Sequence, residues 1–302
     1  METTLFQQKI SALLPDIELR LNESMAKHTS FQIGGPAEVM AFPKDSKELS
    51  EILQKSAMLD CNVAILGAGT NILAPDEGIA GLVICLKDCM DGIERLDGDR
   101  IRVAAGVTMA RAAVFAAGQN LGGMEFAHGI PGTVGGGVYM NAGAYGGEIK
   151  DICESADVVL PDGRLVTIPA AEMAFSYRHS RLEEEQGIVV SVVFKLTPKP
   201  EAEIREQMQE LLKKRKASQP LEYPSAGSAF KRPIGGYAAA LIDQAGLKGY
   251  QVGGAAVSEK HAGFVVNLGG ATAKDVNDLL SQVAQIVFEH SGIQLEPEVR
   301  LW

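Results

Sequence analysis

The hydrophobic pattern of this chain alternates between short strand-like runs and helices. Apolar residues repeat at helical spacing in residues 45–58, and Thr108 is expected to cap an alanine-rich helix that stops at Gly118. Further helices are predicted at the N-terminus, ending near Pro15, and over residues 201–217, 236–245 and 272–290. Strands are predicted at 63–66, 82–86, 188–196 and 264–267, and hairpins should join 93–96 to 101–105 and 156–160 to 165–168.

The order of these elements indicates an α+β fold. Strands and hairpins dominate the first two-thirds of the chain, and a mixed helix-and-strand unit closes it. The Pro-Lys-Pro run at residues 198–200 is the best domain boundary, because it ends a long Val-rich strand and precedes a helix. The chain therefore divides into residues 1–199 and 200–302.

The segment of residues 128–148 is rich in glycine and almost free of charge. Its glycines are Gly129, Gly132, Gly135, Gly136, Gly137, Gly143, Gly146 and Gly147, and Pro131 lies among them. Each glycine in a helix costs about 0.5–1 kcal/mol relative to alanine, so no ordinary core element is expected here. We expect tight turns whose bare N–H groups bind phosphate or a flat ring. The alternative is a structural loop packed against another backbone.

A second glycine turn follows the strand predicted at 63–66. Gly67-Ala68-Gly69-Thr70-Asn71 begins like the dinucleotide fingerprint G-x-G-x-x-G but has Ile72 at the sixth position, and Pro75 interrupts the helix that should follow. The chain also has no P-loop motif. Two glycine turns suit a diphosphate and a ring system held by main chain, as in FAD.

Composition excludes several functional classes. The 302 residues carry a net charge of −10, which argues against general nucleic-acid binding. The apolar runs are far shorter than the roughly 20 residues of a membrane span, and the charged N-terminus does not resemble a signal peptide. The cysteines, Cys61, Cys85, Cys89 and Cys153, form no metal or disulfide pattern, so we expect buried thiols, a cytoplasmic protein and no metal site.

Several motifs together resemble one enzyme family. They are TSFQIGGPA at 29–37, LGAGTN at 66–71, GIPGTVGG at 129–136, NAGAYG at 141–146, SYR at 176–178, AGSAFK at 226–231, SEKHAGF at 258–264 and PEVR at 297–300. The first three alone are typical of flavoproteins with an FAD domain of the vanillyl-alcohol-oxidase (PCMH) type. The full set, in order, resembles the shorter class of the UDP-N-acetylenolpyruvoylglucosamine reductases.

The resemblance implies a fold, a cofactor and a reaction. Residues 1–199 would bind FAD through two subdomains split near residue 80, and residues 200–302 would bind substrate. NADPH would reduce noncovalent FAD, which would then reduce UDP-N-acetylglucosamine enolpyruvate to UDP-N-acetylmuramate for peptidoglycan synthesis. We expect a cytoplasmic monomer or weak oligomer. The FAD contacts would be Gly67, Ala68, Gly69, Thr70, Asn71, His128, Gly129, Ile130, Pro131, Gly132, Thr133, Gly135, Gly136, Asn141 and Gly143.

The same resemblance assigns three catalytic residues. Arg178 would hold the substrate carboxylate, Ser228 would donate the proton that quenches the enolate, and Glu298 would act on the enolate side, paired with Arg300 if that stretch is extended. Read from the residues alone, Arg178 and Glu298 could equally be surface charges and Ser228 a turn residue.

The substrate-binding residues would be Tyr177, Arg178, Lys231, Arg232, His261 and Arg300. Arg232 replaces the Asn that is frequent in the family, and a lone His261 is commonly a hydrogen-bonded structural residue. Two rival functions keep some of these motifs. Another FAD oxidase or dehydrogenase would keep the glycine turns without AGSAFK and PEVR. A flavin- or nucleotide-binding sensor would not need Arg178, Ser228 and Glu298 together.

Overall fold

The computed structural model describes residues 3–302, and they form two compact units. Unit 1 contains the chain up to Leu21, Glu38–Ala68 and Ala80–Lys214, and unit 2 contains Asn22–Ala37, Gly69–Ile79 and Arg215–Trp302. Segments 22–37 and 69–79 thus belong with the C-terminal residues. The functional division of the chain at residue 199 stays a prediction.

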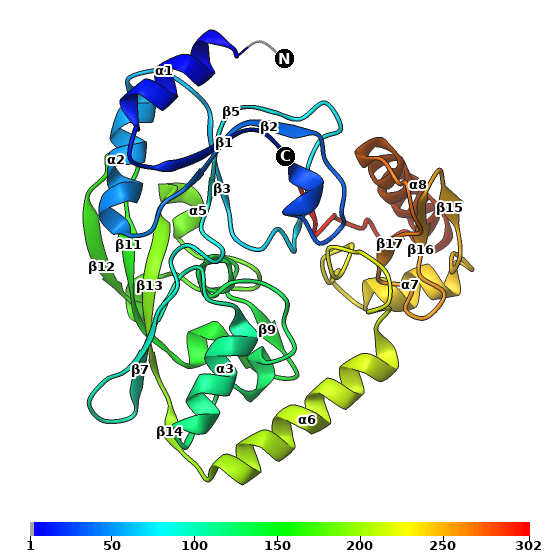
Figure 1. Ribbon diagram of the computed structural model, residues 1–302. Helices are drawn as coiled ribbons and strands as arrows, with labels where there is room; N and C mark the ends of the chain where they lie inside the picture. The colour runs from blue at the N-terminus through cyan, green and yellow to red at the C-terminus, as the bar shows by residue number, and fades with distance from the viewer. Residues whose placement is uncertain (1–2) are drawn as a thin grey trace. The chain divides into compact units, whose positions relative to one another are not determined.

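A four-stranded sheet opens unit 1 (Figure 1). Its order is β1 (Glu18–Ser24), β2 (Pro36–Phe42), β5 (Ile79–Cys85) and β3 (Val63–Leu66), with β3 and β5 parallel. One end of β1, β2 and β5 belongs to unit 2. The helices α1 (Leu5–Leu13) and α2 (Ser46–Ala57) belong to the same unit. Asp45 caps α2 through Lys47 and Glu48 amides, and the buried Leu49 and Ile52 pack with the sheet's Leu82 and Ile84.

The second sheet of unit 1 has five antiparallel strands. Its order is β12 (Leu165–Pro169), β11 (Cys153–Val159), β13 (Ile188–Lys195), β7 (Arg100–Ala104) and β6 (Ile93–Arg95). The Thr108 side chain caps α3 (Met109–Gly118), as predicted, by accepting from the Arg111 amide. Small alanines of α3 pack into the same core as Val192 and Phe194, so this helix lies close to the sheet. The helix α6 (Glu201–Ser218) follows (Figure 1).

The glycine-rich segment contains a helix, which corrects our expectation of turns alone. α4 (Val134–Tyr139) has the sequence VGGGVY and is capped by Thr133. Its glycines allow close packing: a Cβ on Gly135 would lie 2.9 Å from the Ala105 Cβ, and one on Gly137 would lie 2.9 Å from the Met109 Sδ. Packing against the core therefore outweighs the low helix propensity of glycine.

Unit 2 is an α+β unit built around a small antiparallel sheet. β15 (Gln251–Val252), β16 (Ala255–Val257) and β17 (Val265–Asn267) are accompanied by α7 (Ala238–Gln244) and α8 (Ala273–Ser291). Thr272 and Asp275 form a capping box at the start of α8, and Gly292 ends the helix in the left-handed conformation. The strand β18 (Arg300–Leu301) runs parallel to β4 (Ile72–Leu73).

The remaining elements are short. They are β8 (Leu121–Gly122), β9 (Gly143–Ala144), β10 (Gly147–Glu148), β14 (Thr197–Pro198), α5 (Leu182–Glu185) and the 3₁₀ turns η1 (Met25–Lys27), η2 (Glu125–Ala127), η3 (Ile149–Asp151) and η4 (Ala170–Glu172).

The predicted α+β class is confirmed, and each predicted helix is present within a few residues of its expected bounds. Among the strands of three or more residues, the sequence pattern missed β1, β2 and β16.

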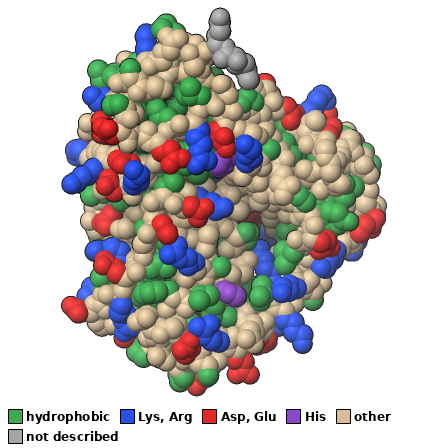
Figure 2. All heavy atoms as spheres, viewed as in Figure 1, with side chains coloured by type: hydrophobic (Ala, Val, Ile, Leu, Met, Phe, Trp, Pro, Cys, Tyr) green, Lys and Arg blue, Asp and Glu red, His purple; other side chains and the backbone are tan. Residues whose placement is uncertain are grey.

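The surface of the described residues and the four cysteines bear on further predictions. No helix within residues 3–302 is long and apolar enough to cross a membrane. Over most of the face in Figure 2, acidic and basic side chains lie interspersed. Only Cys85 and Cys153 are buried, so the expectation of buried thiols is wrong for the half-buried Cys61 and Cys89. Burial raises the pKa of Cys89 to about 11 and that of Cys153 to about 12.

Candidate functional site

The first glycine turn meets the glycine-rich segment inside unit 1. A Cβ on Gly67 would lie only 2.6 Å from the Thr133 Oγ1, so glycine is required for this approach. The same Thr133 Oγ1 caps α4 by accepting from the Gly136 amide at 3.4 Å. Gly132 has a φ of 132°, which suits glycine alone. Two predicted FAD-binding stretches are therefore neighbours.

Polar groups of this region fit a cofactor with a diphosphate and a heteroaromatic ring. Among residues 3–302, the Nδ1 atom of His128 is buried without a hydrogen-bond partner. Within the same range, the amides of Gly129, Gly132 and Thr133 donate no hydrogen bond to protein. Such oriented amides and an orphaned buried nitrogen match the demands of FAD. Burial, and then the charge of Arg205, lowers the pKa of His128, which keeps the ring neutral.

Later residues of the first glycine turn lie in unit 2 and serve its architecture. Gly69 has a φ of 61°, and its Cα faces the His28 carbonyl so closely that a side chain would clash. The Nδ2 of Asn71 donates to the Glu298 carbonyl at 3.2 Å, and the Asn71 carbonyl accepts from the Arg300 amide at 3.0 Å. The turn predicted to bind FAD therefore also fixes the segment of a predicted catalytic residue.

Arg178 occupies a tight turn of unit 1 over residues 176–179. The Ser176 and His179 backbones exchange hydrogen bonds of 3.2 and 3.4 Å across this turn. Arg178 has a φ of 55°, and its Cζ lies 5.1 Å from the centre of the Tyr177 ring. A non-glycine residue in this conformation costs roughly 1–2 kcal/mol. The structure therefore presents two predicted substrate-binding side chains on a strained turn, which is common at functional sites.

Ser228 and Glu298 are neighbours in a backbone ladder of unit 2. Ser228 forms a bridge with Phe264, and the next residue, Ala229, donates its amide to Gly263 at 2.8 Å. The Ala229 carbonyl accepts from the Glu298 amide at 2.9 Å. Ser228 is therefore the chain neighbour of Ala229, the residue whose carbonyl binds the Glu298 amide.

Four further predicted substrate residues also lie in unit 2. Lys231 forms an exposed ion pair of 3.3 Å with Glu296, and Arg232 places its Cζ 4.2 Å from the centre of the Tyr237 ring. The Nδ1 of His261 accepts from the Gly263 amide at 3.1 Å. Burial lowers the pKa of His261, a local hydrogen bond opposes the shift, and the charge of Lys248 adds to it. Arg300 begins β18 beside Asn71.

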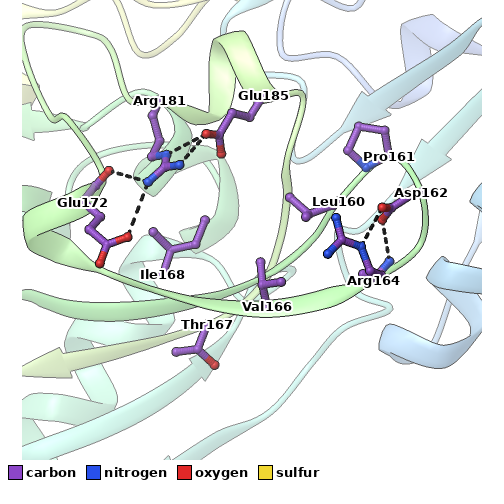
Figure 3. A pocket seen from close by; sticks show the side chains of 10 residues that line it. All are labelled: Leu160, Pro161, Asp162, Arg164, Val166, Thr167, Ile168, Glu172, Arg181 and Glu185. Atoms are coloured by element: carbon purple, nitrogen blue, oxygen red, sulfur yellow. Dashed lines mark hydrogen bonds and ion pairs between the residues drawn. The ribbon is translucent and has the colours of Figure 1, made fainter.

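A separate pocket of about 560 Å³ lies on the β11–β12 hairpin and the segment before α5 (Figure 3). Its lining holds none of the predicted site residues. Arg181 pairs there with Glu172 and Glu185, and Arg164 pairs with Asp162. Because carboxylates already neutralise both guanidinium groups, this pocket is a poor receptor for an anionic substrate.

Some residues beside the site escaped the sequence analysis. Glu148, Lys150 and Ser180 all bond to the segments that carry Asn141 and Arg178. Glu148 offered one signal, because it is the charge that ends the glycine-rich run; Ser180 offered none. Among residues 3–302, no three His, Cys, Asp or Glu side chains cluster as a metal site would require.

Two parts of the chain match models of known protein families. Residues 37–169 match an FAD binding domain, and residues 219–302 match the C-terminal domain of UDP-N-acetylenolpyruvoylglucosamine reductase.

Curated reductases of that name are similar over nearly the whole chain. The one from Agathobacter rectalis is 47% identical and that from Streptococcus pneumoniae (strain Hungary19A-6) is 44% identical; each alignment covers 98% of this chain, and 98% and 97% of the relatives. The crystal structure of UDP-N-acetylenolpyruvylglucosamine reductase from Thermus caldophilus has a TM-score of 0.80 and 37% identity, over 95% of this chain and 98% of that one. The predicted FAD-domain fold is confirmed.

Proposed function

Because this chain belongs to the UDP-N-acetylenolpyruvoylglucosamine reductase family, we propose that it reduces UDP-N-acetylglucosamine enolpyruvate to UDP-N-acetylmuramate with NADPH, as a step of peptidoglycan synthesis. The family and the FAD binding domain make it an FAD-dependent oxidoreductase. We further propose that FAD is noncovalent and that the enzyme is a cytoplasmic monomer or weak oligomer.

Main-chain amides and His128 would hold FAD in unit 1. Gly129, Gly132 and Thr133 offer amides for the phosphates, and the neutral His128 offers its buried Nδ1 to a polar group of the cofactor. FAD, once reduced by NADPH, would supply the hydride for the terminal carbon of the enolpyruvyl group. Gly67 has no Cβ, which allows its backbone to lie close to the Thr133 side chain.

Arg178 would bind the substrate carboxylate and resist loss of its own charge. A guanidinium group binds a carboxylate through two parallel hydrogen bonds and stays protonated at neutral pH. When the substrate's double bond is reduced, negative charge develops in conjugation with that carboxylate. A fixed cation therefore stabilises the transition state more than the ground state.

Ser228 would deliver the proton from its Oγ to the carbon that bore the developing charge. A serine hydroxyl is a weak acid, so the carbanion must be strongly basic and the serine must be reprotonated afterwards. The carboxyl group of Glu298 would act on the enolate, and Glu298 is a neighbour of the serine in the ladder. The hydrogen bond from the Glu298 amide to the Ala229 carbonyl is the observation that carries this proposal, because it places the two residues on paired segments of backbone.

Anaerobic reduction and product analysis test the function directly. The purified protein should be yellow, and denaturation should release FAD into the supernatant. NADPH should bleach the flavin, and UDP-N-acetylglucosamine enolpyruvate should restore its absorbance while UDP-N-acetylmuramate forms. NADH in a parallel reaction measures nicotinamide preference. A colourless protein that gains no flavin absorbance with added FAD, or a reduced flavin that this substrate does not reoxidise, would reject the proposal.

A further inference from the structure

The turn that carries Arg178 is anchored at both ends to the glycine-rich segment. Before the turn, the Nδ2 of Asn141 donates to the Ser176 carbonyl at 2.9 Å. After it, the Oγ of Ser180 donates to the Tyr139 carbonyl at 2.8 Å. Both anchoring side chains are buried, with 1% exposure for Asn141 and none for Ser180. Both side chains donate to backbone carbonyls.

The Asn141 amide is fully engaged inside the protein. Its Nδ2 also donates to the Glu148 carboxylate at 2.9 Å, and its Oδ1 accepts from the Lys150 amide at 3.0 Å. These partners leave one orientation for the side chain, because Nδ2 faces two acceptors and Oδ1 faces a donor. Asn141 was predicted to contact FAD, but its two donors already have protein partners.

Glu148 reinforces this orientation through charge. Its carboxylate also pairs with the Lys150 Nζ at 2.8 Å. Hydrogen bonds from Lys150 and Asn141, and the charges of Lys150 and Arg178, lower the pKa of Glu148 despite some opposing desolvation. The carboxylate therefore stays ionised at neutral pH and remains an acceptor for Asn141.

We infer that Asn141 and Ser180 are positioning residues that hold the strained Tyr177–Arg178 turn in its substrate-binding conformation. Two backbone bonds, of 3.2 and 3.4 Å, close the turn around Arg178 at positive φ. Without the outer anchors, relaxation of Arg178 would displace its guanidinium group. A displacement of 1 Å at a substrate-binding group can lower the rate on the order of 10²-fold.

The inference rests on the proposed function, because it assigns the turn a role in binding the enolpyruvyl carboxylate. The test uses FAD-loaded protein and the variants Asn141→Leu and Ser180→Ala. Each should slow reoxidation of the reduced flavin by the substrate, by about 10²-fold in Asn141→Leu and about tenfold in Ser180→Ala. In Ser180→Ala, flavin reduction by NADPH should stay within about twofold. Ser180→Thr keeps the hydroxyl and should recover most of the loss.

A matched control removes a similar bond elsewhere in unit 1. Ser56 is also buried, and its Oγ donates to the Leu53 carbonyl at 3.0 Å within α2. Ser56→Ala should leave both half-reactions at the wild-type rate. If it slows reoxidation as much as Ser180→Ala does, the loss reflects general destabilisation and the inference fails.

Hydrogen exchange measures how the two anchoring side chains protect the turn in the absence of substrate. The amides of Ser176 and His179 should exchange faster in Asn141→Leu and Ser180→Ala than in wild type, while the strand amides of β13 keep their protection. Faster exchange with unchanged reoxidation would overturn the positioning role. If Asn141→Leu does not fold, Ser180→Ala and its threonine rescue decide the question. A wild-type protein that does not turn over the substrate rejects the proposed function instead, and exchange still measures the anchors.

Discussion

The turn that carries Arg178 and the ladder that carries Ser228 are held by different kinds of bond. Side chains anchor the turn, since Asn141 donates to the Ser176 carbonyl and Ser180 donates to the Tyr139 carbonyl. The ladder is built from backbone pairs, such as the Glu298 amide with the Ala229 carbonyl at 2.9 Å. In the turn, Arg178 has a positive φ, whereas neither Ser228 nor Glu298 does.

This difference determines what a substitution can reveal. A backbone ladder keeps its geometry when a side chain is shortened, so replacing Ser228 should remove its hydroxyl and leave the backbone pairs of the ladder in place. The turn depends on particular side chains, so substitutions around it change geometry before they change chemistry. The predictions below separate the two cases.

Ser228→Ala should have the largest effect. General acid catalysis is typically worth about 10²–10⁴-fold, so reoxidation of reduced flavin by the enolpyruvyl substrate should fall by that order. Flavin reduction by NADPH should stay near wild type, because no enolate forms in that half-reaction. Stopped-flow absorbance measures both rates. Equal slowing of the two half-reactions would give Ser228 a structural role, contrary to the ladder geometry.

Arg178→Gly should separate stability from activity at the turn. Loss of the guanidinium group should lower the rate of reoxidation by about 10²-fold or more, since a charge-assisted hydrogen bond is worth about 1.5–3 kcal/mol and two are lost. Relief of the positive φ should at the same time keep or raise the free energy of unfolding, by up to about 1 kcal/mol. Urea titration at saturating FAD measures the second quantity.

Gln186→Gly is the matched control for that variant. Gln186 has a φ of 52° at the end of α5 and touches none of the predicted site residues through the hydrogen bonds described. Gln186→Gly should change the free energy of unfolding by a similar amount and leave the rates of both half-reactions at their wild-type values. Clear destabilisation of Arg178→Gly alone would show that the arginine side chain itself stabilises the turn.

Arg232→Ala should have a smaller effect, on substrate binding alone. If the guanidinium group contacts a phosphate of the UDP-sugar, its loss should raise KM about tenfold with little change in kcat. Arg164→Ala, at the pocket of Figure 3, removes an arginine that pairs with Asp162 and should leave KM unchanged. An unchanged KM in Arg232→Ala would exclude Arg232 from substrate binding.

The sequence predicted the regular elements well where local signals were strong. The Thr108 cap and the hairpin that joins 156–160 to 165–168 were predicted from local signals, and both are observed. The helices predicted at 45–58 and 272–290 are also present, and the structure shows that Asp45 and Thr272 cap them. α4 could not be predicted, because its stability comes from contacts of Gly135 and Gly137 with residues 105 and 109. Helix propensity does not contain that information.

Site residues were recognisable as motifs, but their supports were not. The resemblance of the motifs to those of the family singled out Arg178, Ser228 and Glu298, and whether they contact substrate stays a prediction. Nothing in the sequence joined Asn141 to Ser176, or Asn71 to Glu298, because these pairs are 35 and 227 residues apart. Long-range side-chain bonds depend on the completed fold, so only the structure could identify Ser180 and Glu148.

The smallest predicted effect concerns His261 and the pH dependence of stability. Burial lowers its pKa in the folded state, and its Nδ1 accepts from the Gly263 amide, a bond that protonation at Nδ1 would abolish. The unfolded chain therefore binds more protons than the folded one, and His261 contributes a loss of stability as the pH falls through its unfolded pKa of about 6.5. His261→Asn supplies a neutral acceptor, so the difference in the free energy of unfolding between about pH 5.5 and 7.5 should shrink, though not vanish, since burial also lowers the pKa of His128. His290→Asn, on the exposed end of α8, should keep the wild-type difference. An unchanged difference in His261→Asn would mean that the folded and unfolded states bind protons at this histidine equally.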